Sequence, residues 1–496
     1  MRERIDVELS ERFQEEVLLP EAIRDYEMNF AEIILLNKAY GLMLKEIGIL
    51  DREECKRIVA ALNRVQDTMK KEDIRGNCED LYFNVEQAMI RETGIETGGK
   101  LHTGRSRNDL YSALSRMEVR KTSWEIVERL IELQKILIER AEENLDTVIT
   151  GYTHMQPGQP ITLGHYYSAA CYALTRDFTR ISNAYEHTNR SPYGAAAFAG
   201  ATFPIDREYL CQLTGFDRMI ENSIDCIAAK DYLVEMEMAY TILMNNISRF
   251  ATDMYFWATD ECGILDLGGE VAICSSIMPQ KKNPVCFEYA KAKGAHTMGG
   301  MISALTVLKN VPYTNNTDIF ETSTMYEESL IQTKQGLGIF TEAVRYSSIK
   351  RERAFAMAEE NYSTVTGLAD YLVVKFDFSF EEAHGITGKA VGSIADRNGT
   401  IHELTDRLLM ETAREITGKR ITITADEIKE VLDPWNNIEN KKTAGSPNRK
   451  HVEQMLTELK DLVKNEEAWL YEKKNKVKAA YGRLTQECDL LWEDER

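Results

Sequence analysis

The sequence predicts an all-α protein in which a long central helix bundle is flanked by two smaller helical domains. The chain has 496 residues, which is too long for one ordinary compact core. Proline, which breaks helix interiors, is absent from residues 21–156, 205–278 and 313–433. Apolar residues recur at three- and four-residue spacings within these stretches, whereas strong period-two alternation is scarce. Long helices therefore account for the pattern better than strands do.

Two amphipathic stripes predict the bundle helices. The first stripe consists of Ile126, Leu130, Leu133, Leu137 and Ala141, with Glu, Lys and Arg between them. The second alternates spacings of three and four, and it consists of Leu233, Met236, Tyr240, Leu243, Ile247, Phe250, Met254 and Trp257. A seam sustained over about seven turns is typical of a helix inside a bundle.

Glycine-rich or turn-rich stretches interrupt these helices and predict the connections between them. They are residues 94–109, 150–164, 190–206, 262–284 and 310–318. We expect an N-terminal helical domain at residues 1–108, the central bundle at 109–360 and a C-terminal helical domain at 361–496. In a bundle protein the connections are also where functional side chains gather.

Composition restricts the partners and the compartment. With 60 Lys and Arg against 80 Asp and Glu, the formal charge is −20, which argues against nucleic acid and anionic membranes as partners. The nine cysteines are odd in number and form no CxxC pair, which indicates free thiols in a reducing compartment. The first residues are charged, with no apolar signal region, and no apolar run reaches membrane-spanning length. We expect a cytoplasmic protein.

Residues 103–109, TGRSRND, form the first connecting segment that could take part in binding or catalysis. Ser106 and Asp109 fit a helix-capping pattern, and free N–H groups at a helix start bind anions. The arginines of the segment add bidentate carboxylate recognition. On the pattern alone, a capped helix with surface arginines remains the simpler interpretation.

Two further segments carry possible acid, base and anion-binding groups. In residues 151–165, GYTHMQPGQPITLGH, His154 stands beside Thr153 and could transfer protons near neutral pH, or simply make one hydrogen bond in a loop. In residues 268–284, GGEVAICSSIMPQKKNP, glycines give mobility, while Lys281 and Asn283 can meet negative charge. Such a loop can close over a substrate, although paired serines and lysines are also common on surfaces.

The same segments carry a family resemblance. Residues 275–284, SSIMPQKKNP, resemble the SSxMPxKxNP signature of the fumarase/aspartase superfamily. Five more segments resemble argininosuccinate lyase in the same chain order: GGKLHTGRSRND, GYTHMQPGQPIT, SPYGAAAFAGATFPIDRE, NYSTVTGLADYLV and LDPWNNIENKKTAGSPNRKHVEQML. Six matches in order over about residues 20–457 do not arise by chance. The chain thus resembles the argininosuccinate lyase branch, an enzyme family of amino-acid metabolism and arginine biosynthesis.

The resemblance implies an architecture and an assembly. Its members are all-α, with a long-helix bundle between two smaller domains. They form homotetramers whose bundles combine into a twenty-helix core. Each active site in such a tetramer takes loops from three subunits. The stripe from Leu233 to Trp257 would be one of the core helices.

The resemblance also implies a reaction and the residues that perform it. The reaction is an anti β-elimination that cleaves an N-substituted aspartate, such as argininosuccinate, into fumarate and an amine or amino acid, without metal or organic cofactor. The catalytic residues it implies are Ser275 as base, His154 as acid with Thr153, Glu288 orienting the histidine, and Lys281. The substrate-binding residues it implies are Ser106, Arg107, Asn108, Gln159 and Asn283, with Asn315, Phe320 and Ser323 at the leaving group.

The chain departs from the family pattern around the leaving group. Asn315, Phe320 and Ser323 replace a tyrosine, a glutamine and a lysine that grip the amino-acid end of the arginine moiety. Each lost charged hydrogen bond costs about 1.5–3 kcal/mol. Other departures are Asn37 for serine, Tyr82 for the histidine of EDxH, Leu110 for glutamine, Cys274 for glycine and Val285 for aspartate.

Three interpretations follow from these departures. In the first, the leaving group is a different amine or amino acid, and the enzyme works as a lyase or as a synthase that adds the amine to fumarate. In the second, the chain is a divergent argininosuccinate lyase with a rebuilt pocket. In the third, it is a catalytically silent structural homologue; the presence of Ser275, Lys281 and His154 argues against this one.

Overall fold

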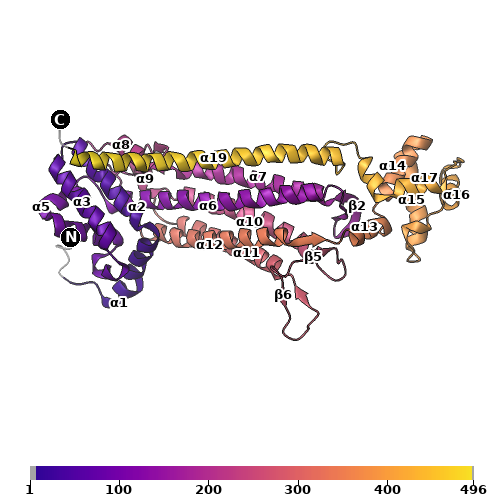
Figure 1. Ribbon diagram of the computed structural model, residues 1–496, viewed down its shortest axis with the longest axis horizontal. Coiled ribbons are helices and arrows are strands. Elements are labelled where there is room, and N and C mark those ends of the chain that lie inside the picture. The colour runs from indigo at the N-terminus through magenta and orange to yellow at the C-terminus, as the bar shows by residue number, and fades with distance from the viewer. Residues whose placement is uncertain (1–6, 494–496) are drawn as a thin grey trace.

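The computed structural model describes residues 7–493 as an elongated, mostly helical molecule with three regions in a row (Figure 1). The N-terminal helices form one end, long helices form the middle, and residues 351–439 form the other end. The predicted all-α fold with a central bundle is confirmed. The domain boundaries at residues 108 and 360 stay predictions.

The N-terminal region packs short and medium helices around one hydrophobic core. Its elements are α1 (Glu11–Phe13), the π-helical η1 (Gln14–Leu18), α2 (Leu19–Glu46), α3 (Arg52–Thr68), η2 (Lys71–Asp73), η3 (Gly76–Cys78), α4 (Leu81–Thr93), α5 (Ile95–Gly98) and η4 (Gly99–His102). Later parts of the chain join this core, namely α8 (Arg207–Thr214) and the residues Leu484, Cys488 and Leu491. The short α9 (Ser223–Ala228) lies beside the start of the bundle.

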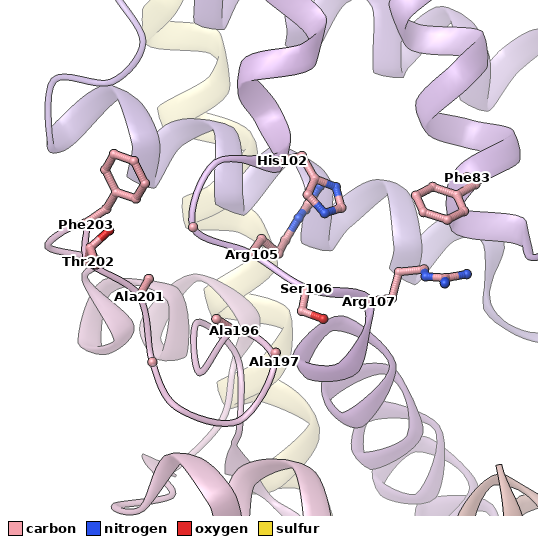
Figure 2. Close-up of a pocket in the computed structure, with 12 residues that line it drawn as sticks. Phe83, His102, Arg105, Ser106, Arg107, Ala196, Ala197, Ala201, Thr202 and Phe203 are labelled. Atoms are coloured by element: carbon pink, nitrogen blue, oxygen red, sulfur yellow. The ribbon is translucent and has the colours of Figure 1, made fainter. Parts of the chain in front are cut away.

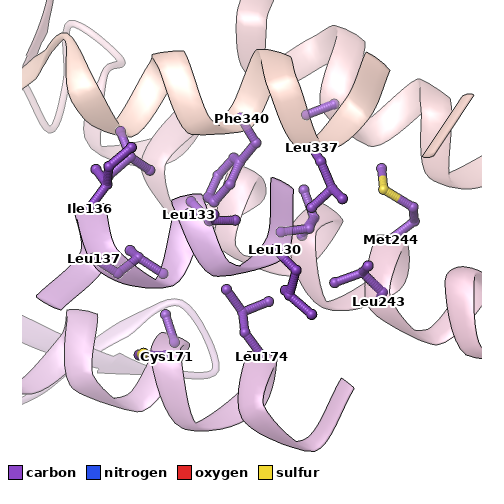
Figure 3. Close-up of a cluster of buried hydrophobic side chains, with 14 of the residues drawn as sticks. Leu130, Leu133, Ile136, Leu137, Cys171, Leu174, Leu243, Met244, Leu337 and Phe340 are labelled. Atoms are coloured by element: carbon purple, nitrogen blue, oxygen red, sulfur yellow. The ribbon is translucent and has the colours of Figure 1, made fainter. Parts of the chain in front are cut away.

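The bundle consists of α6 (Arg107–Glu143), α7 (Leu163–Thr188), α10 (Asp231–Trp257), α11 (Val285–Leu308), α12 (Asp318–Arg345) and α19 (Arg449–Asp489). Both predicted stripes lie in its core, on α6 and α10. Figure 3 shows Leu130, Leu133 and Leu137 of α6 between Leu174 of α7 and Phe340 of α12. Phe250 is the exception in the α10 stripe, because it is only partly buried and packs against this core from the edge.

The connections contain short strands that pair into four two-stranded sheets in the described part of the chain. Antiparallel pairs join β1 (Val148–Thr153) to β2 (Gln156–Thr162), β5 (Leu265–Leu267) to β8 (Ser347–Ile349), and β6 (Ile273–Cys274) to β7 (Lys282–Asn283); β3 (Arg190–Ser191) and β4 (Arg218–Met219) pair in parallel. The connections predicted at residues 150–164 and 262–284 are thus partly hairpins. The β6–β7 hairpin projects from the side of the bundle (Figure 1).

The far end of the molecule has its own hydrophobic core. Its elements are α13 (Arg351–Glu360), α14 (Val365–Phe376), α15 (Phe380–Ala395), η5 (Ile401–Glu403), α16 (Asp406–Thr417), α17 (Ala425–Leu432) and α18 (Pro434–Glu439). The core extends from Leu368 on α14 to Ile428 on α17. Helix α19 then returns along α6 and α7 to the N-terminal region, where the chain ends its described part in η6 (Leu490–Trp492).

One side of the bundle exposes apolar side chains. Helix α11 is rich in apolar residues but buries few of them, and Tyr289, Met298, Ile302 and Leu305 are each 45–54% exposed. Neighbouring α10 and α12 add Met238, Ile242 and Ile331. An apolar surface on adjacent helices is typical of an interaction face. In residues 7–493 no helix has the length and apolar character needed to span a membrane.

Candidate active site

The segment predicted to bind anions forms the start of α6. Ser106 is its N-cap: its Oγ accepts a hydrogen bond from the Asn108 N–H at 3.2 Å. The Asp109 carboxylate accepts in turn from the Ser106 N–H at 3.2 Å, which completes a capping box. The predicted cap is confirmed. Asp109 also accepts from the Gly194 and Ala196 N–H groups, and so joins the segment to the loop after β3.

The side chains of Arg107 and Asn108 are held by their neighbours. Arg107 Nη1 lies 2.8 Å from Asp80 Oδ2 and 3.1 Å from Glu79 Oε2, and its guanidinium stands 4.3 Å from the centroid of the Phe83 ring. Asn108 Nδ2 donates to the Ala197 carbonyl at 3.1 Å. Both groups are therefore oriented without substrate, although Arg107 shares its charge with two carboxylates.

A cavity of about 420 Å³ opens beside this helix start (Figure 2). One wall is formed by His102, Arg105, Ser106 and Arg107, and the other by the loop of residues 196–203. N–H groups, guanidinium groups and a hydroxyl thus meet in one small space at a helix N-terminus. Such an arrangement suits a carboxylate of a small substrate.

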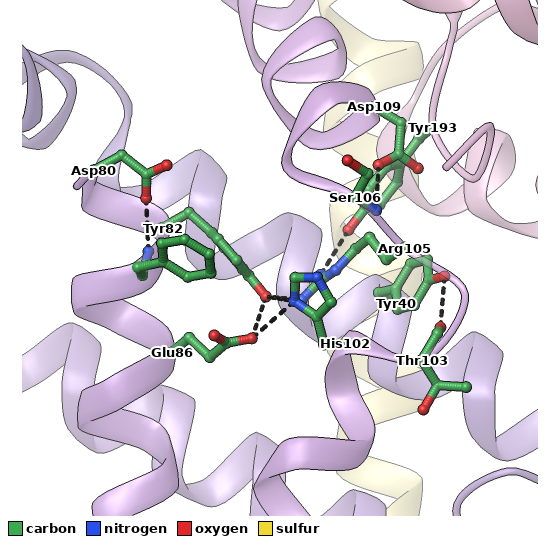
Figure 4. A network of polar contacts seen from close by, with 11 residues as sticks. Tyr40, Asp80, Tyr82, Glu86, His102, Thr103, Arg105, Ser106, Asp109 and Tyr193 are labelled. Carbon is green, nitrogen blue, oxygen red and sulfur yellow. Dashed lines mark hydrogen bonds and ion pairs between the residues drawn. The ribbon is translucent and has the colours of Figure 1, made fainter. Parts of the chain in front are cut away.

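Arg105 lies buried behind that cavity in a polar network (Figure 4). Its Nη2 donates to the Tyr82 hydroxyl at 2.8 Å and its Nη1 donates to the Tyr193 hydroxyl at 3.2 Å. The guanidinium stands 4.7 Å from the ring centroid of Tyr40 and 4.9 Å from that of Tyr82. Aromatic faces and hydroxyls therefore stabilise a cation that is only 6% exposed.

Glu86 and His102 complete the network. The Tyr82 hydroxyl donates to Glu86 at 2.5 Å, and His102 Nδ1 lies 3.0 Å from Glu86 Oε1 and 2.8 Å from the Tyr82 hydroxyl. Burial alone would raise the pKa of Glu86, but the hydrogen bonds from His102 and Tyr82 outweigh it and lower that pKa. Sequence reasoning gave Arg105 only a general role in carboxylate recognition and did not assign Glu86 or His102 to the site, because their contacts join elements distant in sequence.

Thr153 and His154 lie at the tip of the β1–β2 hairpin. His154 and Met155 adopt positive φ angles of 52° and 58° in the turn, and both side chains are exposed. Gln159 on β2 accepts from Lys441 Nζ at 3.3 Å. His154 is therefore accessible to another molecule at the tip of the hairpin.

Ser275 follows β6 at the tip region of the projecting hairpin. Its Oγ accepts hydrogen bonds from the Ile277 N–H at 3.3 Å and the Met278 N–H at 3.0 Å. Lys281 is exposed, and Asn283 lies on β7. Two N–H groups directed at one hydroxyl oxygen favour its alkoxide, which a serine base requires.

Glu288 stands in the first turn of α11, where its Oε1 accepts from the Tyr255 hydroxyl at 3.2 Å.

The residues expected at the leaving group lie around the start of α12, at the other end of the bundle from the first turn of α11. Asn315 precedes α12, and Phe320 and Ser323 lie one turn apart on it. The buried Lys230, which sequence reasoning missed, places its Nζ 5.6 Å from the Phe320 ring centroid. Burial, with Arg116 nearby, lowers the pKa of Lys230 to about 7.

The three predicted segments do not meet within one chain. Ser106 precedes α6 and the β1–β2 hairpin follows it, and the 37 residues of that helix span ~55 Å. The β6–β7 hairpin projects from the bundle between these two ends (Figure 1). The structure thus brings together Ser106, Arg107 and Asn108, but it leaves His154 and Ser275 apart from them and from each other.

Known proteins resemble this chain over most of its length. A "Lyase" family model matches residues 8–299, and an "Argininosuccinate lyase C-terminal" model matches residues 362–439. Argininosuccinate lyase 1 of Shouchella clausii (strain KSM-K16) is 37% identical over 94% of both chains. Argininosuccinate lyase of Bacillus subtilis (strain 168) is 34% identical, over 87% of this chain and 92% of that protein.

Solved structures agree in fold. A variant of EDDS lyase with bound fumarate superposes with a TM-score of 0.87 at 31% identity, over 98% of this chain and 97% of that one. A class II fumarase from Schistosoma mansoni shares the fold with a TM-score of 0.66 at 16% identity, over 84% and 94% of the two chains. From the family models and the full-length relatives together, the chain belongs to the argininosuccinate lyase family of the fumarase/aspartase superfamily.

Proposed function

We propose that this protein is a carbon–nitrogen lyase that cleaves an N-substituted aspartate by anti β-elimination and releases fumarate with an amine or amino acid. Ser275 carries the proposal, because its hydroxyl oxygen already receives two backbone N–H groups within the superfamily signature. The fumarate bound to the related EDDS lyase variant supports the same product. The family relatives are argininosuccinate lyases, and argininosuccinate is the first substrate to test.

Each step of the reaction has a candidate group. Ser275 removes the β-proton of the succinyl unit, and the two N–H groups stabilise its alkoxide. The resulting carbanion places a second negative charge on the neighbouring carboxylate. Lys281 and Asn283 bind this carboxylate and stabilise the charge. His154, aided by Thr153, protonates the departing nitrogen. Glu288 orients that histidine.

The other end of the substrate meets the start of α6. Ser106, Arg107 and Asn108 bind the succinyl carboxylates at the helix N-terminus, beside the cavity of Figure 2. Gln159 lies on the hairpin of His154 and contacts the substrate from that side. Asn315, Phe320 and Ser323 surround the leaving amine, for which they offer weaker polar contacts than the family pattern does.

The active site is assembled from several copies of the chain. Helix α6, which is ~55 Å long, separates Ser106 from the hairpin of His154 in one copy, so both reach one substrate only if different copies supply them. The exposed apolar side chains on α10, α11 and α12 provide the surface for this association. A homotetramer with a common helical core satisfies both observations, and small dicarboxylate and amine molecules are the partners of its sites.

Fumarate release from argininosuccinate, followed by ultraviolet absorbance, tests the proposal. Ser275→Ala should reduce turnover by about 10²–10⁴-fold, because a general base contributes that much. The adjacent Ser276→Ala is the matched control and should retain most activity. Equal turnover in Ser275→Ala and Ser276→Ala would remove Ser275 from the base role.

If argininosuccinate releases no fumarate, the same assay runs in reverse with fumarate and a panel of amines. Consumption of fumarate with any amine, abolished by Ser275→Ala, identifies a lyase or synthase with a different leaving group. No reaction with argininosuccinate or with any amine would favour a catalytically silent homologue.

A further inference from the structure

A buried lysine, Lys230, lies at the leaving-group end of the bundle. It is the N-cap residue of α10, and its side chain is 3% exposed. Its Nζ lies 5.6 Å from the ring centroid of Phe320, one of the residues placed around the leaving amine. Phe320 is itself 37% exposed, so a molecule that contacts this ring comes close to the ammonium group.

Lys230 carries its charge without a counter-ion. Its Nζ forms neither an ion pair nor a hydrogen bond with any of residues 7–493. The charge that acts on its pKa is that of Arg116 on α6, a second buried cation. Buried charges in proteins are ordinarily paired, so a buried ammonium without an anion indicates that a ligand supplies one.

Two acids stand in the neighbourhood, but they are not partners of this lysine. Asp225 on α9 accepts a hydrogen bond from the Tyr313 hydroxyl, and Asp231 opens α10 at an exposed position. Burial lowers the pKa of Arg116, and both acids counter that shift from a distance. Among the described residues, neither acid lies within ion-pair distance of Arg116 or Lys230. The position beside the lysine ammonium is therefore open to an anion from outside the chain.

The leaving group can supply this anion. Alkylamines are cations near neutral pH, so a leaving group with an amine alone would meet Lys230 as a like charge. A carboxylate on the same molecule would instead pair with the ammonium. The argininosuccinate lyase pattern has a lysine for the amino-acid end of arginine where this chain has Ser323. Lys230, beside Phe320, offers a cation from α10 in place of the one that α12 lacks.

We propose that Lys230 determines the specificity of the leaving-group site by binding a carboxylate of the departing amine, which is therefore an amino acid or another amine with an acidic group. A lysine ammonium is a compact charge that binds a carboxylate through charge-assisted hydrogen bonds. Amines without an acid, such as alkylamines and diamines, are disfavoured. The inference rests on the proposed function, which places the leaving amine between Asn315, Phe320 and Ser323.

Isothermal titration calorimetry on Ser275→Ala, which should bind substrates without cleaving them, tests the role of Lys230. The ligands are argininosuccinate and N-succinylagmatine, which is the same molecule without the carboxylate of the leaving group. We expect argininosuccinate to bind about 10- to 100-fold more tightly, as for the gain of one charged contact. Adding Lys230→Met should remove this difference. Adding Lys478→Met, at an exposed position of α19, is the matched control and should keep it.

Proton uptake provides a second readout, which a purely structural role of Lys230 would not change. Burial, with Arg116 nearby, lowers the pKa of Lys230 to about 7, so at pH 8 the free lysine is mostly uncharged. A bound carboxylate favours the charged form and draws in a proton. Calorimetry at pH 8 in two buffers of different ionisation enthalpy should show more proton uptake with argininosuccinate than with N-succinylagmatine. Lys230→Arg, which stays charged, should bind argininosuccinate without this extra uptake.

Several results would overturn the inference. They are equal affinity for the two ligands, a difference that survives Lys230→Met, equal proton uptake with both ligands, or no binding of argininosuccinate. Fumarate release by the wild type separates the inference from the proposed function. Release from both ligands with equal kcat/KM would uphold the lyase and overturn the role of Lys230. A preference for the carboxylate that depends on Lys230, without any fumarate release, would leave Lys230 as a carboxylate-binding residue and overturn the lyase reaction.

Discussion

Tyr82 occupies the position of the histidine in the family's EDxH pattern, and its hydroxyl links three charged or titratable groups. It accepts from Arg105, donates to Glu86 and contacts His102. Around it stand the hydroxyl of Tyr111 on α6, which accepts from the Tyr82 N–H, and the ring of Tyr40 on α2, across Arg105. A tyrosine does not titrate near neutral pH in this setting, because burial raises its pKa well above 10.

Removing that hydroxyl should loosen the segment that binds the succinyl end. Tyr82→Phe leaves Arg105 Nη2 and one Glu86 oxygen without their shared partner, at a cost of about 1–3 kcal/mol. We expect KM for an N-succinyl substrate to rise by roughly tenfold, with a smaller change in kcat. Tyr471→Phe, on an exposed part of α19, should change neither constant. An unchanged KM in Tyr82→Phe would show that the network does not position the segment.

Tyr82→His restores the family residue and should introduce a pH dependence. A histidine there changes charge near pH ~6.5, next to the cation of Arg105. Its protonation places two cations side by side, so KM should rise more steeply than in the wild type as pH falls below about 6.5. The pH profile of KM for the two proteins measures this, and superimposable profiles would contradict it.

Helices α10 and α12 are joined across the bundle core by an acid that forms no ion pair with any residue in the described part of the chain. Glu237 is fully buried on α10, and its Oε1 accepts from the Ser329 hydroxyl of α12 at 3.1 Å. Burial raises the pKa of Glu237 to about 7, against an ordinary value of 4.5. The folded protein therefore holds a proton that the unfolded chain releases between these two pH values.

This proton makes the contact between the two helices pH-dependent. Since the folded-state pKa is the higher one, the contribution of Glu237 to stability is present below pH 4.5 and is lost as pH rises through about 7. Glu237→Gln should remove the dependence and exceed the wild type in unfolding free energy by on the order of 3 kcal/mol above pH 7. Denaturant unfolding at several pH values measures the difference, with Glu139→Gln, at an exposed position of α6, as control. A difference that does not grow with pH would refute this.

The long helices could be predicted from the sequence, whereas the hairpins could not. The apolar stripes of α6 and α10 repeat over many turns, so the helical pattern can be recognised even though single residues such as Phe250 are only partly buried. Strand β2 has prolines at two of its seven positions and no regular alternation of buried and exposed side chains, and thus lacks the pattern that marks a strand. Its pairing with β1 depends on the turn at His154 and on packing against α10, which are tertiary features.

The sequence names a set of candidate site residues, whose roles stay predictions, but it does not give their geometry. Ser106, His154 and Ser275 stand out through the resemblance, yet their positions at separate parts of the bundle follow from the length and direction of α6. Glu86 and His102 were missed, and Arg105 was expected only to recognise a carboxylate, because a buried ion network depends on which helices pack together. Lys230 was missed because a lysine before a helix is ordinarily exposed.

At the scale of the whole molecule, association of copies should be required for catalysis. Ile302 is 52% exposed on the apolar side of α11, and Ile302→Asp would place a charge in the proposed interface between copies. We expect smaller assemblies by analytical ultracentrifugation and a parallel loss of fumarate release. Ile416→Asp, on exposed α16, should keep both. A fully active, stable monomer would contradict the shared site.

Mixing two inactive variants tests the sharing directly. Ser106→Ala and Ser275→Ala each damage a different contribution to the site, so hybrids contain some sites in which both contributions are intact. Refolding the two together should restore a fraction of wild-type activity, which neither variant refolded alone should show. Absence of any recovery, with hybrids demonstrated by differential tagging, would place both residues in one copy's site.

The path of α19 has a consequence for how the protein folds while it is being synthesised. The hydrophobic core of the N-terminal region includes Leu484, Cys488 and Leu491, and Arg52 of α3 donates to the Leu490 carbonyl. The N-terminal helices are synthesised first, but their hydrophobic core is complete only when the end of α19 has left the ribosome. At usual rates of synthesis this takes tens of seconds. During this interval their apolar faces lack a cover, so nascent chains of this protein should be clients of chaperones that shield exposed segments during translation.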